Sequence, residues 1–169
     1  MQNDVEMRPR DRVLAALAGK NIDRPAVVCP TSIATVALMD RVNAPFPVAH
    51  QDAESMTRLA ETAYTEVGFD SVMPVFSVVQ ESVAIGCEVE WSNKSNWPTC
   101  TGHIARSADD ISIPSDVLTK PETSCVLESL SMLARRWGDE VAIIGKTMGP
   151  WTLAYHLFGT QPFLMMTID

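Results

Sequence analysis

Residues 141–159 constrain the fold more than any other part of the sequence. The apolar run 141–144, with its β-branched valine and isoleucines, is typical of a strand buried on both faces in a parallel sheet. A loop with a glycine at each end, 145–149, follows it, and Pro150 suits the first position of a helix, where its missing N–H would have no partner. Because α/β enzymes bind ligands where a strand ends and such a helix begins, this stretch is the best candidate for chemistry in the chain.

Helical patterns occupy much of the sequence before this stretch. Residues 53–67 give the clearest one, because Met56, Leu59, Ala63 and their neighbours form a continuous apolar stripe and Asp52 is a suitable N-cap. Further helices are predicted at residues 10–18, 31–42 and 121–137, with a helical turn at 81–85.

Strand patterns lie between these helices. Short apolar runs predict strands at residues 26–29 and 71–79, although Pro74 interrupts the second. We expect residues 43–50, which carry two prolines, to form a loop, and residues 87–112 to form an irregular excursion with room for a hairpin. Strands that alternate with helices indicate an α/β fold with parallel strands.

The net charge of −8 argues against two classes of main partner, although it leaves room for a small local basic site. Nucleic acids and anionic membranes select for basic surfaces, so neither is expected as the main partner. No apolar run is long enough to span a bilayer, and the first residues are too polar for a secretory signal. The four cysteines are scattered without a C-x-x-C pair, which favours free thiols in a reducing cytoplasm.

Three segments carry a resemblance to a known family. In chain order they read RDRVLAALAGKNIDRPAVV, FDSVMPVFSVVQESVAIGCEVEW and GPWTLAYHLFG. They resemble the opening helix and strand, the second strand with its A-x-G-C-E segment, and the G-P-[WF]-T-L-A segment of the uroporphyrinogen decarboxylase superfamily. Within that superfamily they are most similar to the branch of corrinoid:coenzyme M methyltransferases, which use methylcobalamin.

The resemblance implies a (β/α)8 TIM barrel, which typically needs about 250 residues. We therefore expect residues 1–169 to be the N-terminal portion, about half, of a single truncated barrel domain. The sequence stops inside an amphipathic segment, residues 163–169, which also suggests an interrupted protein.

Three positions separate the methyltransferase branch from the decarboxylases. The decarboxylases hold substrate carboxylates with an arginine-bearing segment after the first strand, and residues 30–35 contain no arginine here. Their aspartate that binds tetrapyrrole nitrogens corresponds to Ser77, and their substrate-polarising tyrosine to His156. Without those groups, and with a net charge of −8, binding a polycarboxylate is physically implausible.

The methyltransferase branch moves a methyl group from a corrinoid protein carrying methylcobalamin to a small thiol such as coenzyme M. The resemblance also implies zinc, bound by a His-x-Cys pair and a later cysteine, which activates the thiol as a thiolate. Those ligands belong to the second half of the family's sequence, so we expect no metal ligands in this chain and no activity from it alone.

Four residues are the candidates for chemistry in this half. His156 and Glu81 are the candidate catalytic residues, because each follows a predicted strand where the active face of a barrel lies. Ser77 and Lys146 are the candidate substrate-binding residues at the strand ends. The competing interpretations are a hydrogen-bonded histidine at the edge of the core and solvated side chains at the other positions.

The remaining candidate residues are better explained by structural roles or by a position at the surface. Cys87 is better explained as a small buried hydrophobe than as a reactive thiol, and His50 and His103 as surface residues in loops. Trp91 and Trp97 either line a surface for the corrinoid protein or cover the barrel end.

Two alternative functions remain open from the sequence. One is a uroporphyrinogen decarboxylase of porphyrin biosynthesis, which the family name alone suggests. The other is a non-catalytic module that docks a corrinoid protein.

Overall fold

The computed structural model describes residues 6–91 and 93–168 as a mixed α/β fold. The helices are α1 (Pro9–Leu17), α2 (Val36–Arg41), α3 (Val48–Gln51), α4 (Ala53–Thr65), α5 (Gln80–Ile85), α6 (Pro121–Trp137), α7 (Pro150–Phe158) and α8 (Thr160–Met166). The strands are β1 (Ser71–Val72), β2 (Glu88–Glu90), β3 (Thr99–Gly102) and β4 (Ala142–Ile143). None of the helices in these ranges has the length and apolar character needed to cross a bilayer.

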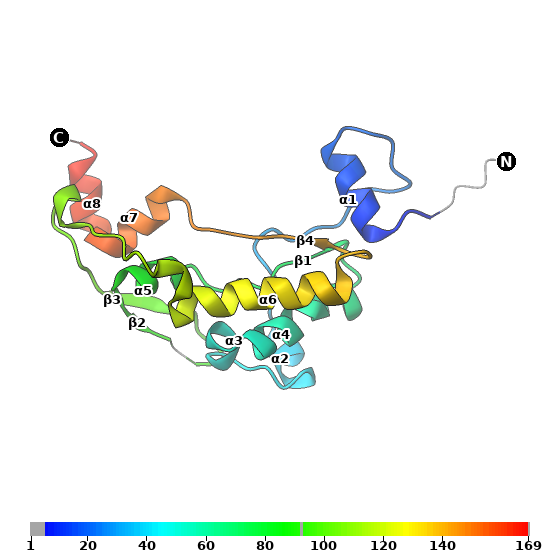
Figure 1. Ribbon diagram of the computed structural model, residues 1–169, viewed down its shortest axis with the longest axis horizontal. Coiled ribbons are helices and arrows are strands. Elements are labelled where there is room, and N and C mark those ends of the chain that lie inside the picture. The colour runs from blue at the N-terminus through cyan, green and yellow to red at the C-terminus, as the bar shows by residue number, and fades with distance from the viewer. Residues whose placement is uncertain (1–5, 92, 169) are drawn as a thin grey trace.

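Strands β1 and β4 pair in parallel near the middle of the molecule (Figure 1). Ser71 lies opposite Ala142 and Val72 opposite Ile143, so segments far apart in the sequence run side by side. Helix α1 lies toward one end of the long axis, and α7 and α8 lie toward the other. The parallel pair confirms the predicted α/β class.

Helices α4 and α6 pack against this strand pair and supply half of the buried residues in the core cluster. Met56 and Leu59 of α4, Leu133 of α6, Val72 of β1 and Val141 before β4 are each at most 1% exposed. Burying side chains of this size contributes about 1.5–3 kcal/mol each to folding. The amphipathic stripes read from the sequence therefore face one shared core.

The predicted helices differ in accuracy. Helices α4, α6 and α7 begin at the predicted residues, and the Asp52 carboxylate accepts the Ser55 N–H at 2.7 Å as the expected N-cap. The predicted helix at 31–42 is too long, because the Thr35 side chain caps α2 and the backbone before it is irregular. The predicted loop at 43–50 is wrong at its end, where α3 begins.

The predicted strands are mostly too long. Residues 26–29 run extended beside β1, but the Val27 N–H donates to the Asp70 carboxylate and the Cys29 N–H to the Ser71 hydroxyl. Side chains thus replace the carbonyl partners that a ladder would need. In residues 71–79 only β1 joins a ladder, and Pro74 has no N–H to continue it. The excursion contains the predicted hairpin, formed by β2 and β3.

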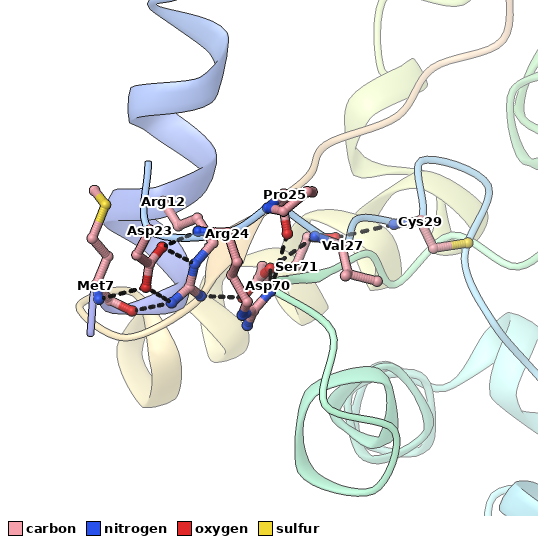
Figure 2. Close-up of polar contacts among 9 residues, drawn as sticks. All are labelled: Met7, Arg12, Asp23, Arg24, Pro25, Val27, Cys29, Asp70 and Ser71. Carbon is pink, nitrogen blue, oxygen red and sulfur yellow. Dashed lines mark hydrogen bonds and ion pairs between the residues drawn. The ribbon is translucent and has the colours of Figure 1, made fainter. Parts of the chain in front are cut away.

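A buried cluster of ion pairs holds the start of the chain to β1 (Figure 2). Arg12 is 1% exposed; its Nη1 donates to Asp70 Oδ1 at 2.6 Å, and its Nε and Nη2 donate to Asp23, both at 2.7 Å. Arg24 Nη1 donates to the other Asp70 oxygen at 2.8 Å. Burial acts to raise the pKa of Asp70, but hydrogen bonds from Arg24, Val27 and Arg12 outweigh it and hold this pKa below its ordinary value. The two arginines and two aspartates balance in charge, and no sequence pattern predicted that they would meet.

His50 of α3 lies in the core rather than in a surface loop. It is 1% exposed and stacks on Phe46 with ring centroids 3.9 Å apart. Its Nε2 has no hydrogen-bond partner among the described residues. Burial lowers the pKa of His50 to about 4, so the imidazole is neutral at physiological pH.

We expect the substitution Arg12→Met to destabilise the chain by about 3–5 kcal/mol, because it leaves Asp23 and Asp70 without their shared buried cation. The change is read as the shift in the free energy of unfolding in urea. Arg8→Met is the matched control, because Arg8 pairs with Asp11 on the surface and its side chain is 61% exposed. Equal effects of the two substitutions would contradict the importance of the buried cluster.

We also expect His50 to make the chain sensitive to acid. Its pKa is lower in the folded chain than the ordinary value of 6.5, so its contribution to stability is complete above pH 6.5. That contribution is lost as the pH falls toward 4, by about 3 kcal/mol in total. Because carboxylates titrate in the same range, the measurement is the difference between the pH profiles of unfolding free energy for the wild type and His50→Phe. Parallel profiles would show that His50 does not carry this dependence.

Candidate functional site

A cavity of about 600 Å³ lies at the carboxyl ends of the parallel segments. Its walls come from the residues that follow the extended segment 26–29, from those that follow β1 and from the loop that follows β4, while the excursion adds Trp97 and Pro98. The lining residues are Thr31, Ser32, Ile33, Ala34, Phe76, Ser77, Val78, Trp97, Pro98, Lys146 and Met148. This is the position at which α/β folds bind ligands.

Lys146 is the one charged residue among those that line this cavity. Its side chain is half-buried, and Nζ donates to the Ser77 carbonyl oxygen at 3.2 Å. Burial lowers the pKa of Lys146, and the nearby charge of Glu81 partly opposes this. Lys146 also lines a second cavity of about 200 Å³, which is walled by Glu81, Thr147 and the first turns of α6.

Ser77 lies on the cavity wall and is 3% exposed. Its hydroxyl donates to Gln80 Oε1 at 3.1 Å, and Gln80 Nε2 in turn donates to the His50 carbonyl oxygen at 2.7 Å. The structure therefore brings the two candidate substrate-binding residues, Ser77 and Lys146, to one cavity.

Glu81 ties the loop after β4 to helix α5. Its Oε1 accepts a hydrogen bond from the Met148 N–H at 3.0 Å and another from the Thr147 hydroxyl at 3.1 Å. Charged acceptors make such bonds stronger than neutral ones do. Glu81 thereby fixes the loop that carries Lys146, and it does not line the larger cavity.

His156 lies in the last turn of α7 and faces α5. Its Nδ1 is 3.2 Å from the Ser82 hydroxyl, and its carbonyl oxygen lies 2.9 Å from Nδ1 of His103. Burial lowers the pKa of His156, while Glu81 raises it and His103 lowers it further. His156 is not among the residues that line the two cavities described above, so it is separated from Ser77 and Lys146.

The sequence missed Gln80 and Ser82, which connect these groups. Gln80 is 3% exposed and Ser82 0% exposed, and each makes hydrogen bonds that tie α5 to its surroundings. The available signal was the polar run Q-E-S directly after an apolar strand pattern, at the end where parallel strands carry function.

The cysteines do not form a metal site. No group of three histidine, cysteine or acidic side chains in residues 6–91 and 93–168 is arranged to hold an ion. Burial raises the pKa of Cys87 and that of Cys125 to about 11, so both remain protonated at neutral pH. A protonated thiol is neither a good nucleophile nor a metal ligand. The residues present do not fit the zinc that the resemblance implies.

Of the two tryptophans in the excursion, only Trp97 lines the larger cavity. Its side chain is 60% exposed at the rim, 5.8 Å from the Phe46 ring. Trp91 instead lies near His50, with ring centroids 6.1 Å apart.

Comparison with known proteins identifies one family. The family described as uroporphyrinogen decarboxylase (URO-D) matches residues 8–169. The methylcobamide:CoM methyltransferase MtbA of Methanosarcina acetivorans is 33% identical over 159 residues, which cover 94% of this chain and 47% of that protein. The methylcobamide:CoM methyltransferase MtaA of Methanosarcina barkeri is 33% identical over 164 residues, covering 96% and 48%.

A solved structure agrees with these relatives. A methyltransferase from Methanosarcina mazei superposes with a TM-score of 0.90 at 32% identity, over 96% of this chain and 49% of that one. The chain spans about half the length of the curated relatives it matches. The match confirms the expected fold class, an α/β fold with parallel strands that corresponds to part of a barrel, and it confirms the resemblance drawn from the three segments.

We expect Glu81→Ala to loosen the loop after β4. Losing one hydrogen bond to a charged acceptor should speed hydrogen exchange at the Met148 amide by about tenfold or more. Glu81→Gln keeps an acceptor oxygen and should have a smaller effect. Glu128→Ala, on the exposed face of α6, is the control and should change nothing at Met148. Unchanged exchange in Glu81→Ala would show that the loop is held by other contacts.

Proposed function

The chain belongs to the uroporphyrinogen decarboxylase family, and we propose that it serves a corrinoid-dependent methyltransferase within that family. In the proposed reaction a methyl group passes from methylcobalamin on a corrinoid protein to the thiol of coenzyme M or a similar acceptor. The relatives named above support this assignment, because methylcobamide:CoM methyltransferases match along 94–96% of the chain.

The composition of the larger cavity is the observation that favours a methyltransferase over a decarboxylase. A porphyrinogen bears many carboxylates, and proteins bind such groups with arginine, whose planar fork matches them. The cavity has no arginine among its lining residues and a single lysine. Apolar and hydroxyl-bearing residues make up the rest of its wall, which suits a ligand with little charge.

The four candidate residues take different roles in this proposal. Lys146 and Ser77, on the cavity wall, contact the substrate. Glu81 acts on the same reaction as a positioning residue, because it fixes the loop that presents Lys146. His156, held by Ser82, orients α7 against α5 and does not contact the substrate in the larger cavity.

Zinc takes no part in the steps proposed for this chain. The described residues do not hold a ligand set for it, and the resemblance assigns those ligands to sequence that the chain does not contain. The working compartment is proposed to be the reducing cytoplasm, where the four cysteines, which are free thiols in the structure, stay reduced.

The test begins with the coding DNA beyond the codon for Asp169. If the frame continues into a His-x-Cys and a later cysteine, we expect the longer protein to consume coenzyme M thiol when methylcobalamin is supplied. The 169-residue chain alone should give no turnover under the same conditions. Loss of the thiol and the absorbance change of the corrinoid are the two readouts.

Other outcomes would favour the alternatives. Turnover of a uroporphyrinogen by the longer protein, without methyl transfer, would overturn the proposal in favour of a decarboxylase. Specific binding of a corrinoid protein by the 169-residue chain, with a cooperative thermal melt and no turnover by any longer product, would favour a non-catalytic docking module.

A further inference from the structure

We propose that Lys146 is the centre of a binding site for a single oxyanion head group, such as the sulfonate, carboxylate or phosphate of a small organic ligand. The site is the part of the larger cavity where Lys146 meets the hydroxyl-bearing residues Thr31, Ser32 and Ser77. This inference deepens the proposed function. The identification of the ligand as the methyl acceptor rests on that function. Binding of the anion can be tested without any methyl transfer.

The charge of Lys146 has no salt-bridge partner in the described part of the chain. Among the described residues, no carboxylate forms a salt bridge with Nζ, and the hydrogen bond found for it goes to the neutral Ser77 carbonyl. An ammonium group has three N–H donors, so donors remain for a ligand. A half-buried cation without a counter-ion lowers the stability of the fold, because it has lost part of its hydration. A bound anion would offset that cost.

The acid whose charge acts on Lys146 is already engaged by the loop after β4. Glu81 acts on Lys146 through its charge, but its Oε1 accepts hydrogen bonds from Met148 and Thr147. Glu81 lines the smaller cavity and not the larger one. The two cavities therefore meet at Lys146, with the acid on one side and an acid-free wall on the other.

The acid-free wall combines hydroxyl-bearing and apolar side chains. No aspartate or glutamate lies among the residues that line the larger cavity, so an anion meets no like charge on the wall itself. Apolar side chains, among them Ile33, Phe76 and Met148, leave room for an uncharged tail beside the head group. The site therefore favours one negative charge on a small, otherwise apolar molecule, and it disfavours a polyanion.

The test is a titration of the 169-residue chain, labelled with ¹³C at the methionine methyl groups and observed by NMR. Met148 lies on the same wall, and its signal is assigned with Met148→Leu. The probes are methanesulfonate, acetate and inorganic phosphate, compared with the neutral analogues dimethyl sulfone and acetamide. Sodium chloride keeps the ionic strength constant, because surface charges respond to salt alone.

We expect a saturable shift of the Met148 methyl signal with at least one anion and none with the neutral analogues. Lys146→Met should weaken that binding by about tenfold or more, which corresponds to one lost charged hydrogen bond. Lys20→Met is the matched control, since it changes the net charge equally but lies outside the cavity. It should leave the affinity within about twofold. The order of affinity among the three anions identifies the preferred head group.

Folding is checked in the same samples. Lys146→Met should melt at the same or a higher temperature than the wild type, because it removes a half-buried charge without an ion pair. If Lys146→Met does not fold, Lys146→Gln, which keeps polarity and loses the charge, replaces it in the titration.

Two results would overturn the inference. One is the absence of a saturable shift with all three anions, and the other is an equal loss of affinity in Lys146→Met and Lys20→Met. Anion binding that depends on Lys146, in a protein whose longer form transfers no methyl group, would leave this site standing and remove the proposed function. Methyl transfer without anion binding at Lys146 would do the reverse.

Discussion

The burial of Asp70 is the constraint on which the rest of the structure depends. Its carboxylate accepts hydrogen bonds from Arg12, from Arg24 and from the Val27 N–H, while its backbone bonds to Val27 on one side and to Ala142 on the other. One residue thus joins α1, the extended segment before β1, and β4. A buried carboxylate is stable only when such partners surround it, so the positions of these segments are coupled.

That coupling sets the register of the strands and, through it, the cavity. Because β1 and β4 run parallel from Asp70 and Val141, their carboxyl ends emerge together and carry Ser77 and Lys146 to one place. Glu81 then fixes the loop after β4 from the side of α5. The geometry at the cavity is therefore determined at two points, one before the strands and one after them.

The sequence predicted the parts of this arrangement that depend on local pattern. The N-cap Asp52 and the proline at the start of α7 each act within a few residues, and both predictions are confirmed. The apolar stripe of 53–67 is confirmed as far as the end of α4 at Thr65, whereas Val67 lies beyond the helix and is 43% exposed. The strands were predicted too long, because a ladder needs backbone partners in register on a neighbouring strand. The N–H groups of residues 26–29 donate to side-chain acceptors instead. The same limit applies to the site. Position after a strand predicted that Ser77, Lys146 and His156 would all lie at the site. Ser77 and Lys146 do meet at one cavity, but His156 lies apart, because position in the sequence does not determine the direction in which a helix side chain points.

The two ends of the strand pair treat charge in opposite ways. Before the strands, two arginines and two aspartates neutralise one another, and Arg12 and Asp70 are almost fully buried. After the strands, Lys146 is half-buried without a salt bridge among the described residues, and burial lowers its pKa. A fold that compensates charge so fully at one end has no structural need for an isolated lysine at the other. An uncompensated lysine is instead what an anion-binding site requires. Such a cation lowers the stability of the empty protein, and binding of an anion from solution stabilises it again.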